Sequence, residues 1–225
     1  MPYGLQLGLS AVVAFLIGSI PFSLYIARAV AGIDLRKHGS GNVGATNVAR
    51  TVGWKWGIAA LLLDATKGVL PTLLLPWLMS EPSPALFHER TLCGAAAVMG
   101  HMFSPWLGFR GGKGVATALG VVAVLAPVAT GCAFLVFVLT FIFSRIVALS
   151  SILAAVTYGV AEFLFRGDVL SSREGWGLGV FAVAIPLLII FRHRSNLVRL
   201  WNGQETRLQL RKKEAAPQDG DSTQA

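Results

Sequence analysis

The chain has 225 residues, of which 54% are hydrophobic and 13% charged, and its mean hydropathy is +0.65. Soluble domains carry roughly 25% charged residues, so the composition excludes an ordinary soluble protein. It indicates an all-α integral membrane protein, because the apolar runs are continuous rather than alternating as in a membrane barrel. We interpret the net charge of +8 as a signal of membrane orientation and anionic lipid, not of nucleic-acid binding.

A helix needs about 20 apolar residues to cross a bilayer, and several runs approach that length. In chain order, we expect helices over Leu5–Val30, Trp54–Met79, Ala85–Phe103, Ile146–Phe165 and Gly175–Ile190, with one long apolar region, 112–143, between the third and the fourth. No basic segment precedes the first run, which is also too long for the apolar part of a signal peptide.

Three clusters of Lys and Arg decide how region 112–143 crosses the membrane. They are Arg36, Lys37, Arg50 and Lys55; Arg110 and Lys113; and Arg192, Arg194, Arg199, Arg207, Arg211, Lys212 and Lys213. Basic clusters favour the cytoplasmic side, so an even number of crossings must separate the second cluster from the third. We therefore predict two helices in this region, broken near Pro127–Gly131. A single kinked helix is the alternative.

This count gives seven transmembrane helices, with the N-terminus outside and the C-terminus in the cytoplasm. We expect residues 1–205 to form one membrane-embedded domain, and residues 206–225 to form a basic and then polar cytoplasmic tail that is partly disordered. Cys93 and Cys132 both lie in apolar runs, which favours helix packing over a disulfide or a metal site. We expect neither a metal nor a cofactor.

Three polar segments share the predicted cytoplasmic face. They are "GSGNVGATNVAR" from Gly39, "GHMFSPWLGFRGGKGVAT" from Gly100 and "FRHRSNLVRLWNGQE" from Phe191. Glycine-rich backbone beside a helix start presents N–H groups to an anion, and basic side chains add positive charge. The pattern indicates one phosphorylated ligand, or two. "GFRGGKGV" lacks the G-x-x-x-x-G-K-[ST] spacing, which disfavours a nucleoside triphosphatase.

The alternative for a basic residue beside the membrane is simple anchoring to anionic lipid. We favour anchoring for Arg194, Arg211, Lys212 and Lys213. We favour a ligand-binding role for Lys113, because its flanking glycines cost conformational entropy that an anchor does not require.

Asp64 and Lys67 lie three residues apart on one face of the second predicted helix, near its middle. Charged groups at that depth face the bundle interior and need partners. The pair is therefore either a support for the site or an internal structural ion pair, and the sequence leaves both open. The same holds for His101, which begins the second polar segment.

Together with "LLLDATKGVLP", the three polar segments resemble, in order, the signature segments of the bacterial acyl-phosphate:glycerol-3-phosphate acyltransferases. The resemblance runs from about Gly18 to Glu205. It implies a seven-helix enzyme of the bacterial cytoplasmic (inner) membrane, with its active site facing the cytoplasm. Such an enzyme transfers a fatty acyl group from acyl phosphate to glycerol 3-phosphate and yields lysophosphatidic acid, the first acylation of phospholipid synthesis. The implied partners are both substrates, the lipid bilayer and the enzyme that supplies acyl phosphate.

The resemblance also assigns the site residue by residue. The catalytic residues it implies are Ser40, Arg50, Lys113, His193 and Asn196. The substrate-binding residues it implies are Asn42, Gly44, Thr46, Asn47, His101, Gly111, Gly112, Gly114 and Glu205. Two positions depart from the pattern. Val43 stands where proline is frequent, and Ala148 stands where many members have serine, with Ser150 and Ser151 as candidate replacements.

We expect Thr46, Asn47 and the neighbouring glycine backbone to cradle acyl phosphate. We expect Arg50, Lys113, His193 and Asn196 to hold glycerol 3-phosphate, with Ser40 assisting. The general base is open between His193 and a substrate phosphate. A covalent acyl group on Ser40 is least favoured, since no local Ser–His–acid motif supports it. The competing function is a transporter or channel for a small phosphorylated anion, which the absence of an inverted repeat disfavours.

Overall fold

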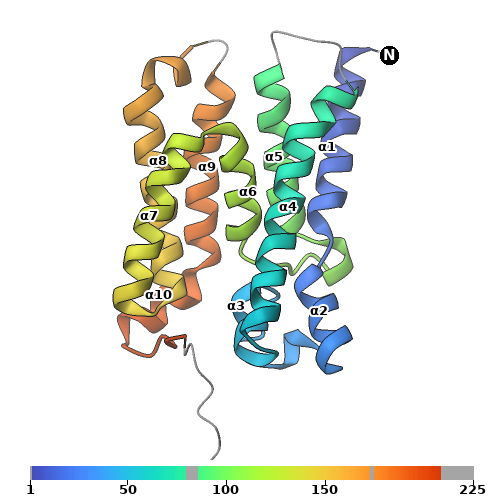
Figure 1. The fold of residues 1–225 in the computed structure, drawn as a ribbon. Coiled ribbons are helices and arrows are strands. Elements are labelled where there is room, and N and C mark those ends of the chain that lie inside the picture. The colour runs from blue at the N-terminus through green and yellow to red at the C-terminus, as the bar shows by residue number, and fades with distance from the viewer. Residues whose placement is uncertain (1, 80–85, 173–174, 209–225) are drawn as a thin grey trace, which may run out of the picture.

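The computed structural model describes residues 2–79, 86–172 and 175–208. These residues form helices and no strand, so the predicted all-α class is confirmed. The α-helices are α1 (Tyr3–Ser19), α2 (Phe22–Ala31), α3 (Ala45–Thr51), α4 (Trp54–Met79), α5 (Leu86–Met102), α6 (Val115–Leu125), α7 (Pro127–Ser144), α8 (Val147–Leu170), α9 (Trp176–Arg192) and α10 (Arg194–Trp201), and the 3-10 helices are η1 (Leu35–Lys37) and η2 (Pro105–Leu107). The long helices stand side by side in one bundle (Figure 1).

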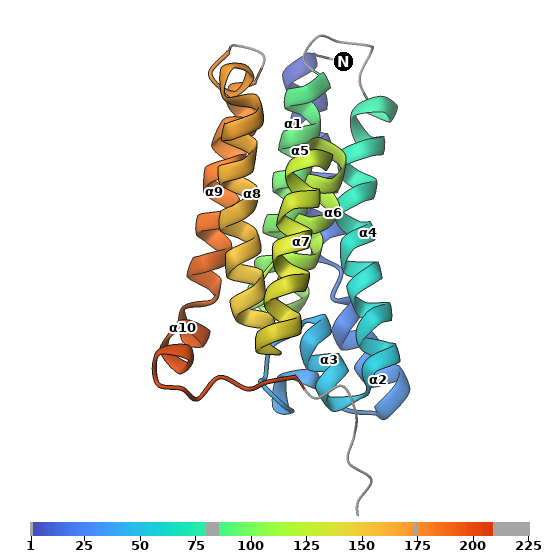
Figure 2. The same ribbon diagram turned by 60° about the vertical axis from the view of Figure 1, so that its left-hand side comes forward.

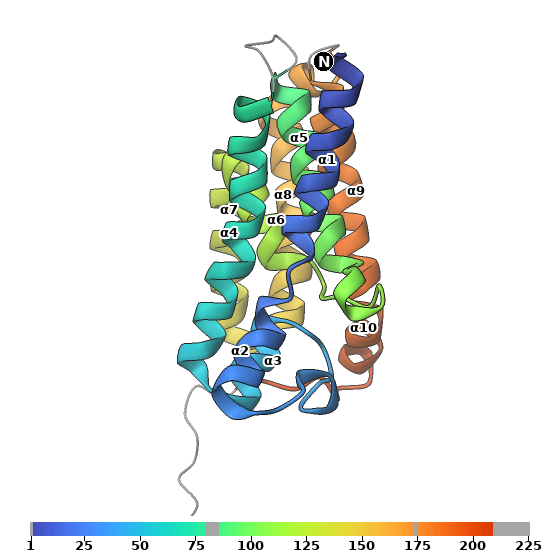
Figure 3. The same cartoon turned by 90° about the vertical axis from the view of Figure 1, so that its right-hand side faces the viewer.

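The predicted single helix over Leu5–Val30 is wrong, because the chain breaks between α1 and α2. Ile20 has an extended ψ of 120° and Pro21 follows it. Proline lacks a backbone N–H and pushes the residue before it out of the helical region. The two helices are offset where they meet (Figure 3), and the break exposes carbonyl groups that other side chains must satisfy.

Region 112–143 forms two helices, α6 and α7, as the charge clusters predict, and the break adjoins the predicted stretch Pro127–Gly131. It lies at Ala126, which has φ −147° and ψ 65°, because proline disturbs the residue before it and is itself well placed at the first helical position. The halves are unequal, with 11 residues in α6 and 18 in α7. At 1.5 Å per residue, α6 spans about 17 Å, little more than half of a bilayer core.

The other predicted helices are found with small changes at their ends. The prediction Trp54–Met79 coincides with α4, and α5 runs to Met102, while the predicted start at Ala85 lies outside the described residues. Helix α8 kinks at Arg166, which has φ −138° and ψ 20°, directly after the predicted end at Phe165, and then runs on to Leu170. Helix α9 continues to Arg192 before the chain bends into α10.

Four stretches of the described chain are long and apolar enough to cross a membrane. They are Tyr3–Ala31, Trp54–Leu78, Pro127–Ser144 and Val147–Leu170. A fifth results if α9 and α10, which are bent by 59°, count as one span. These helices support a multi-pass membrane protein. The number seven and the orientation stay predictions.

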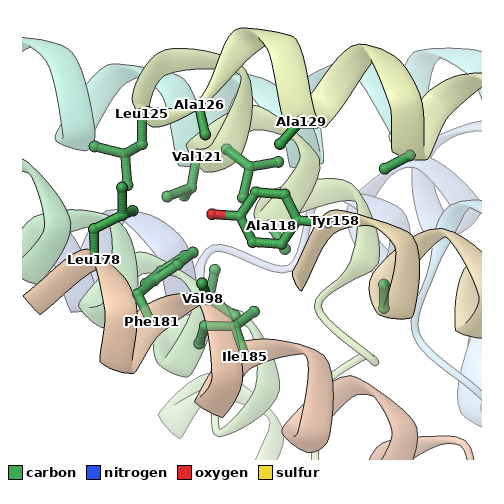
Figure 4. Packing of buried hydrophobic residues seen from close by; sticks show 14 of the residues in the cluster. Val98, Ala118, Val121, Leu125, Ala126, Ala129, Tyr158, Leu178, Phe181 and Ile185 are labelled. Carbon is green, nitrogen blue, oxygen red and sulfur yellow. The ribbon is translucent and has the colours of Figure 1, made fainter. Parts of the chain in front are cut away.

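The helices pack closely where one of them carries glycine. A Cβ at Gly68 of α4 would lie 2.2 Å from the Thr117 carbonyl oxygen of α6, and a Cβ at Gly120 of α6 would lie 2.1 Å from the Ala65 oxygen of α4. Small residues of this kind let membrane helices approach one another. On the other side of α6, a buried apolar cluster that includes Val121, Tyr158 and Phe181 fills the space toward α8 and α9 (Figure 4).

The short elements gather at one end of the bundle. Helices α2, α3 and α10 lie at the end opposite the N-terminus, and the chain after α10 crosses this end below α7 toward α3 (Figures 1 and 2). The three polar segments therefore come together although they are far apart in the sequence.

Candidate active site

One cavity of about 620 Å³ lies among the three polar segments. Ser40 and Arg50 of the first segment, Lys113 of the second and His193 and Asn196 of the third all line it. Helices α4, α7 and α8, with Thr206 and Leu208, supply the rest of the lining, so the cavity has a polar part and an apolar part.

The first wall of the cavity is the loop and short helix 39–50, and one buried amide holds it in shape. Asn47 is 2% exposed. Its Oδ1 accepts a hydrogen bond from the Ser40 backbone N–H at 3.0 Å, while its Nδ2 donates to the carbonyl oxygens of Leu35 at 3.2 Å, His38 at 3.0 Å and Asn42 at 3.0 Å. The amide of Asn47 is thus committed to the loop, and the loop presents Ser40, Thr46 and its own backbone to the cavity.

Glycine is required in this wall at Gly39. Its φ of +61° belongs to the left-handed region, and a Cβ there would lie 2.2 Å from Asn47 Oδ1. Arg50 closes the first wall at the end of α3. Within residues 2–79, 86–172 and 175–208, the Arg50 guanidinium has no ion-pair partner, so its charge is available to a ligand.

The second wall is a chain of polar side chains from Lys113, Asn196, Glu205 and Arg199. Lys113 Nζ donates to Asn196 Oδ1, and Asn196 Nδ2 donates to Glu205 Oε1 at 2.8 Å. The other carboxylate oxygen, Oε2, accepts from Arg199 Nε at 2.8 Å. Glu205 therefore neutralises Arg199 and orients Asn196, which leaves Lys113 as the cation of this wall that faces the cavity without a carboxylate of its own.

Burial lowers the pKa of Lys113 to about 8. The charge of Glu205 opposes this shift, and the charges of Arg199, Arg50 and Arg192 add to it. A bound phosphate would raise the pKa of Lys113 again, because an opposite charge favours the ionised form.

The glycines before Lys113 are clamped from two sides. Arg192 Nη2 donates to the carbonyl oxygens of Gly111 at 2.6 Å and Gly112 at 2.9 Å. A Cβ at Gly112 would lie 2.2 Å from His101 Nε2, so the histidine ring occupies the space of a side chain there. His101 and Arg192 thus fix the backbone that carries Lys113.

His193 lies at the junction between α9 and α10 and is 2% exposed. Its Nδ1 lies 2.8 Å from the Ile189 carbonyl oxygen. A carbonyl can only accept, so Nδ1 carries the proton and Nε2 is the free acceptor. Burial, and then the charge of Lys113, lower the pKa of His193 to about 4. His193 is therefore neutral at pH 7 and a weak base.

The buried pair Asp64–Lys67 reaches the break between α1 and α2. Their atoms lie 2.8 Å apart, and each side chain is 2% exposed. Lys67 Nζ also donates to the Ile20 carbonyl oxygen at 2.7 Å, and Ser23 Oγ donates to Asp64 Oδ2 at 3.2 Å. The lysine thus satisfies a carbonyl that the break exposes. The structural ion pair is therefore present, and Asp64 also lines the cavity, while a supporting role in the site stays a prediction.

The apolar part of the cavity lies between α4, α7 and α8. Its lining is Trp54, Ile58, Leu61, Phe137, Phe141, Val147, Ala148 and Ser151. Ser151, not Ser150, faces the cavity beside Ala148, and its hydroxyl donates to the Val147 carbonyl oxygen at 2.8 Å. This region can take a hydrocarbon chain while the polar walls hold charged groups.

The structure gathers nearly all predicted site residues around one cavity. Gly111 and Gly112 do not line it, although they carry the backbone of Lys113, and Lys67 lines only a much smaller neighbouring cavity together with Gly112. Sequence reasoning missed Arg192 and Arg199, which count among the basic residues of the orientation signal but make specific bonds here. Among the described residues, no cluster of His, Cys, Asp or Glu could hold a metal ion.

A family model described as glycerol-3-phosphate acyltransferase matches residues 8–203. The chain belongs to the glycerol-3-phosphate acyltransferase family. It is 42% identical to the enzyme of that name from Leptospira borgpetersenii serovar Hardjo-bovis (strain JB197), over 94% of this chain and 95% of the relative, and 42% identical to that from Anaeromyxobacter sp. (strain Fw109-5), over 91% and 98%.

Two solved structures agree with this family assignment. The integral membrane glycerol 3-phosphate acyltransferase PlsY in its glycerol 3-phosphate form superposes with a TM-score of 0.79 at 39% identity, covering 90% of this chain and 96% of that chain. Its lysophosphatidic acid form superposes with a TM-score of 0.77 at 38% identity, covering 91% and 96%. The predicted family, the predicted acyltransferase activity and the place in phospholipid synthesis are confirmed.

Proposed function

We propose that this acyltransferase takes its fatty acyl group from acyl phosphate and passes it to glycerol 3-phosphate, which gives lysophosphatidic acid and inorganic phosphate. One observation carries the proposal: a single cavity joins Arg50 and Lys113, two cations without a carboxylate partner among the described residues, to an apolar lining between α4, α7 and α8. An acyl phosphate has a hydrocarbon chain and a charged head, and it fits both parts at once.

The two walls suit two phosphates. The first wall offers backbone N–H groups, Ser40 and Thr46 to the acyl phosphate, with Asn47 shaping the loop rather than touching the ligand. The second wall offers Lys113 and Asn196 to glycerol 3-phosphate, with Arg50 reaching across from the end of α3. Neighbouring phosphates repel each other, and the positive charge of the cavity offsets that repulsion.

The transfer is direct. The hydroxyl oxygen of glycerol 3-phosphate attacks the acyl carbonyl carbon, an ester C–O bond forms, and the bond from that carbon to the phosphate oxygen breaks, so that phosphate leaves with the electron pair. A phosphate titrates near pH 6, above the pKa of about 4 of His193, so a substrate phosphate is the better acceptor for the hydroxyl proton. His193 Nε2 orients that hydroxyl by accepting its hydrogen bond until the transfer.

The proposed setting is a bacterial cytoplasmic membrane with the cavity facing the cytoplasm, seven crossings and the N-terminus outside. The α6 and α7 pair supplies two of the crossings, although α6 alone is short. Glycerol 3-phosphate is soluble and charged, so it reaches the site from the aqueous side where the polar segments gather.

The test is phosphate release by the purified protein in detergent with hexadecanoyl phosphate and glycerol 3-phosphate. We expect inorganic phosphate and lysophosphatidic acid in equal amounts, whereas a transporter of phosphorylated anions would release neither. If acyl-CoA but not acyl phosphate served as donor, the donor assignment would be wrong. A labelled acyl phosphate incubated without acceptor checks direct transfer, since an acyl group trapped on Ser40 would contradict it.

A further inference from the structure

A second ion pair, formed by a half-buried arginine and a buried carboxylate, lies far from the cavity, near the other end of α8. Arg166 Nη1 is 3.1 Å from Glu162 Oε1, and Glu162 is 1% exposed. The same Nη1 donates to the Leu125 carbonyl oxygen at 3.1 Å. The Arg166 guanidinium also lies 5.2 Å from the centre of the Phe87 ring on α5. Arg166 thus links α5, α6 and α8 at one point.

Arg166 lies at a proline break between two helices, just as Lys67 lies at the break between α1 and α2. Lys67, paired with Asp64, donates to Ile20 before Pro21, and Arg166, paired with Glu162, donates to Leu125 at the break before Pro127. In both places proline ends the helical bonding and leaves carbonyl groups without their usual partners. A cation placed there satisfies a carbonyl and complements the negative end of the helix dipole.

Helix α6 connects the contact between Arg166 and Leu125 to the candidate active site. Lys113 and Gly114 come directly before α6, and Gly114, Val115 and Ala116 line the cavity. The last residue of α6 is Leu125. The glycine contacts with α4 set how closely α6 packs, and a bond at the C-terminal end fixes its position along its own axis. Lys113 and Gly114 join α6 to the glycines that Arg192 holds, so a slide of α6 would strain this link and displace Lys113.

We propose that Arg166, held by Glu162, is a positioning residue for acyl transfer: it anchors the C-terminal end of α6 so that the N-terminal end places Lys113 against the acceptor phosphate. The inference rests on the acyl transfer assigned above, and it does not depend on which donor is used. It assigns a role at the active site to a residue about 17 Å away along α6.

The test compares Arg166→Gln with Arg166→Lys in purified protein, using hexadecanoyl phosphate as donor. A misplacement of about 1 Å can cost up to about 100-fold, so we expect Arg166→Gln to raise the KM for glycerol 3-phosphate about 10- to 100-fold with a smaller change in kcat. Arg166→Lys, which can still donate to Leu125 and pair with Glu162, recovers most of the loss. Hydrogen exchange of the amides of residues 115–125 should be faster in Arg166→Gln alone.

The control is Ser171→Ala, which changes an exposed hydroxyl at the same end of α8 and should leave both constants and the exchange unchanged. An Arg166→Gln enzyme with the normal KM, or one that loses kcat and thermal stability together at the normal KM, overturns the proposal. If Arg166→Gln does not fold, Glu162→Gln, which removes the charge that holds the arginine, carries the same expectation. A wild-type protein inactive with acyl phosphate would instead refute the donor, and the exchange comparison would still decide the role of Arg166.

Discussion

The two walls of the cavity present positive or hydrogen-bonding groups to the same space, but they are built differently. The first wall owes its shape to one neutral amide, Asn47, which is hydrogen-bonded to four backbone groups. The second wall is a chain of charged and polar side chains that ends in Glu205 and Arg199. The first wall depends on the single side chain of Asn47, whereas the second wall can lose one side chain and keep part of its function.

The sharpest test of the first wall is Asn47→Asp. Aspartate has nearly the same shape, but its ionised carboxylate has no N–H to donate, so it would face the carbonyls of Leu35, His38 and Asn42 as a buried charge. Each unsatisfied buried group costs about 1–3 kcal/mol, and more beside a charge. We expect complete loss of activity and a lower Tm, measured by thermal unfolding in detergent.

The control for this variant is Asn202→Ala, which changes an exposed asparagine after α10 and should leave the Tm unchanged. If Asn47→Asp kept its activity, the first wall would not depend on that amide, and the contrast between the walls would be lost.

Lys113→Met tests the second wall. Removing one pre-oriented cationic donor from a reacting site costs about 100- to 1,000-fold, so we expect kcat/KM for glycerol 3-phosphate to fall by that amount. The Tm should change little, since burial already disfavours the lysine charge. Steady-state phosphate release measures the loss, and a Lys113→Met enzyme with normal kinetics would remove Lys113 from the site.

Arg50→Lys tests whether Arg50 binds through its planar fork or only through its charge. Lysine keeps the charge but cannot make two parallel bonds to one phosphate. We expect normal folding and a rise of about tenfold in the KM for glycerol 3-phosphate. A tenfold change corresponds to about 1.4 kcal/mol, roughly the net contribution of one hydrogen bond. Unchanged kinetics in Arg50→Lys would mean that the first wall supplies only charge here.

The smallest effect concerns pH. Because the pKa of Lys113 is lowered to about 8, its charge is present below that pH and is lost above it. The KM for glycerol 3-phosphate should therefore rise as pH increases through about 8, while kcat at saturating acceptor stays level, since bound phosphate keeps the lysine charged. In Lys113→Met this rise should disappear, and a rise that persists would point to another group.

Much of the fold could be predicted from the sequence, and the differences at the breaks between α1 and α2 and between α6 and α7 arise at prolines. Helix α4 was predicted to the residue because tryptophans at its start and a long apolar run mark it clearly. The sequence does not reveal the break at Pro21, because the apolar run continues across it. The break predicted near Pro127 lies at Ala126, because proline acts on the residue before it. Hydropathy shows which residues are apolar enough to lie in a membrane, but it does not show where a helix is interrupted.

The residues of the candidate site also divide into those that the sequence reveals and those that it does not. The cavity-lining residues stand in recognisable segments, so Ser40, Arg50 and Lys113 could be found. Arg192 and Arg199 could not, because nothing in a basic cluster distinguishes a cation that anchors lipid from one that clamps the glycines before Lys113 or pairs with Glu205. Only the folded chain brings those partners together.

The path of the chain after α10 has a practical consequence. Glu205, Thr206 and Leu208 all line the cavity, and the Leu208 N–H donates to the Arg145 carbonyl oxygen at the end of α7 at 2.8 Å. The backbone is therefore held beside the cavity up to Leu208, the last residue that the structure describes. A fluorophore or an affinity tag attached there would report on, or obstruct, the entry of substrate.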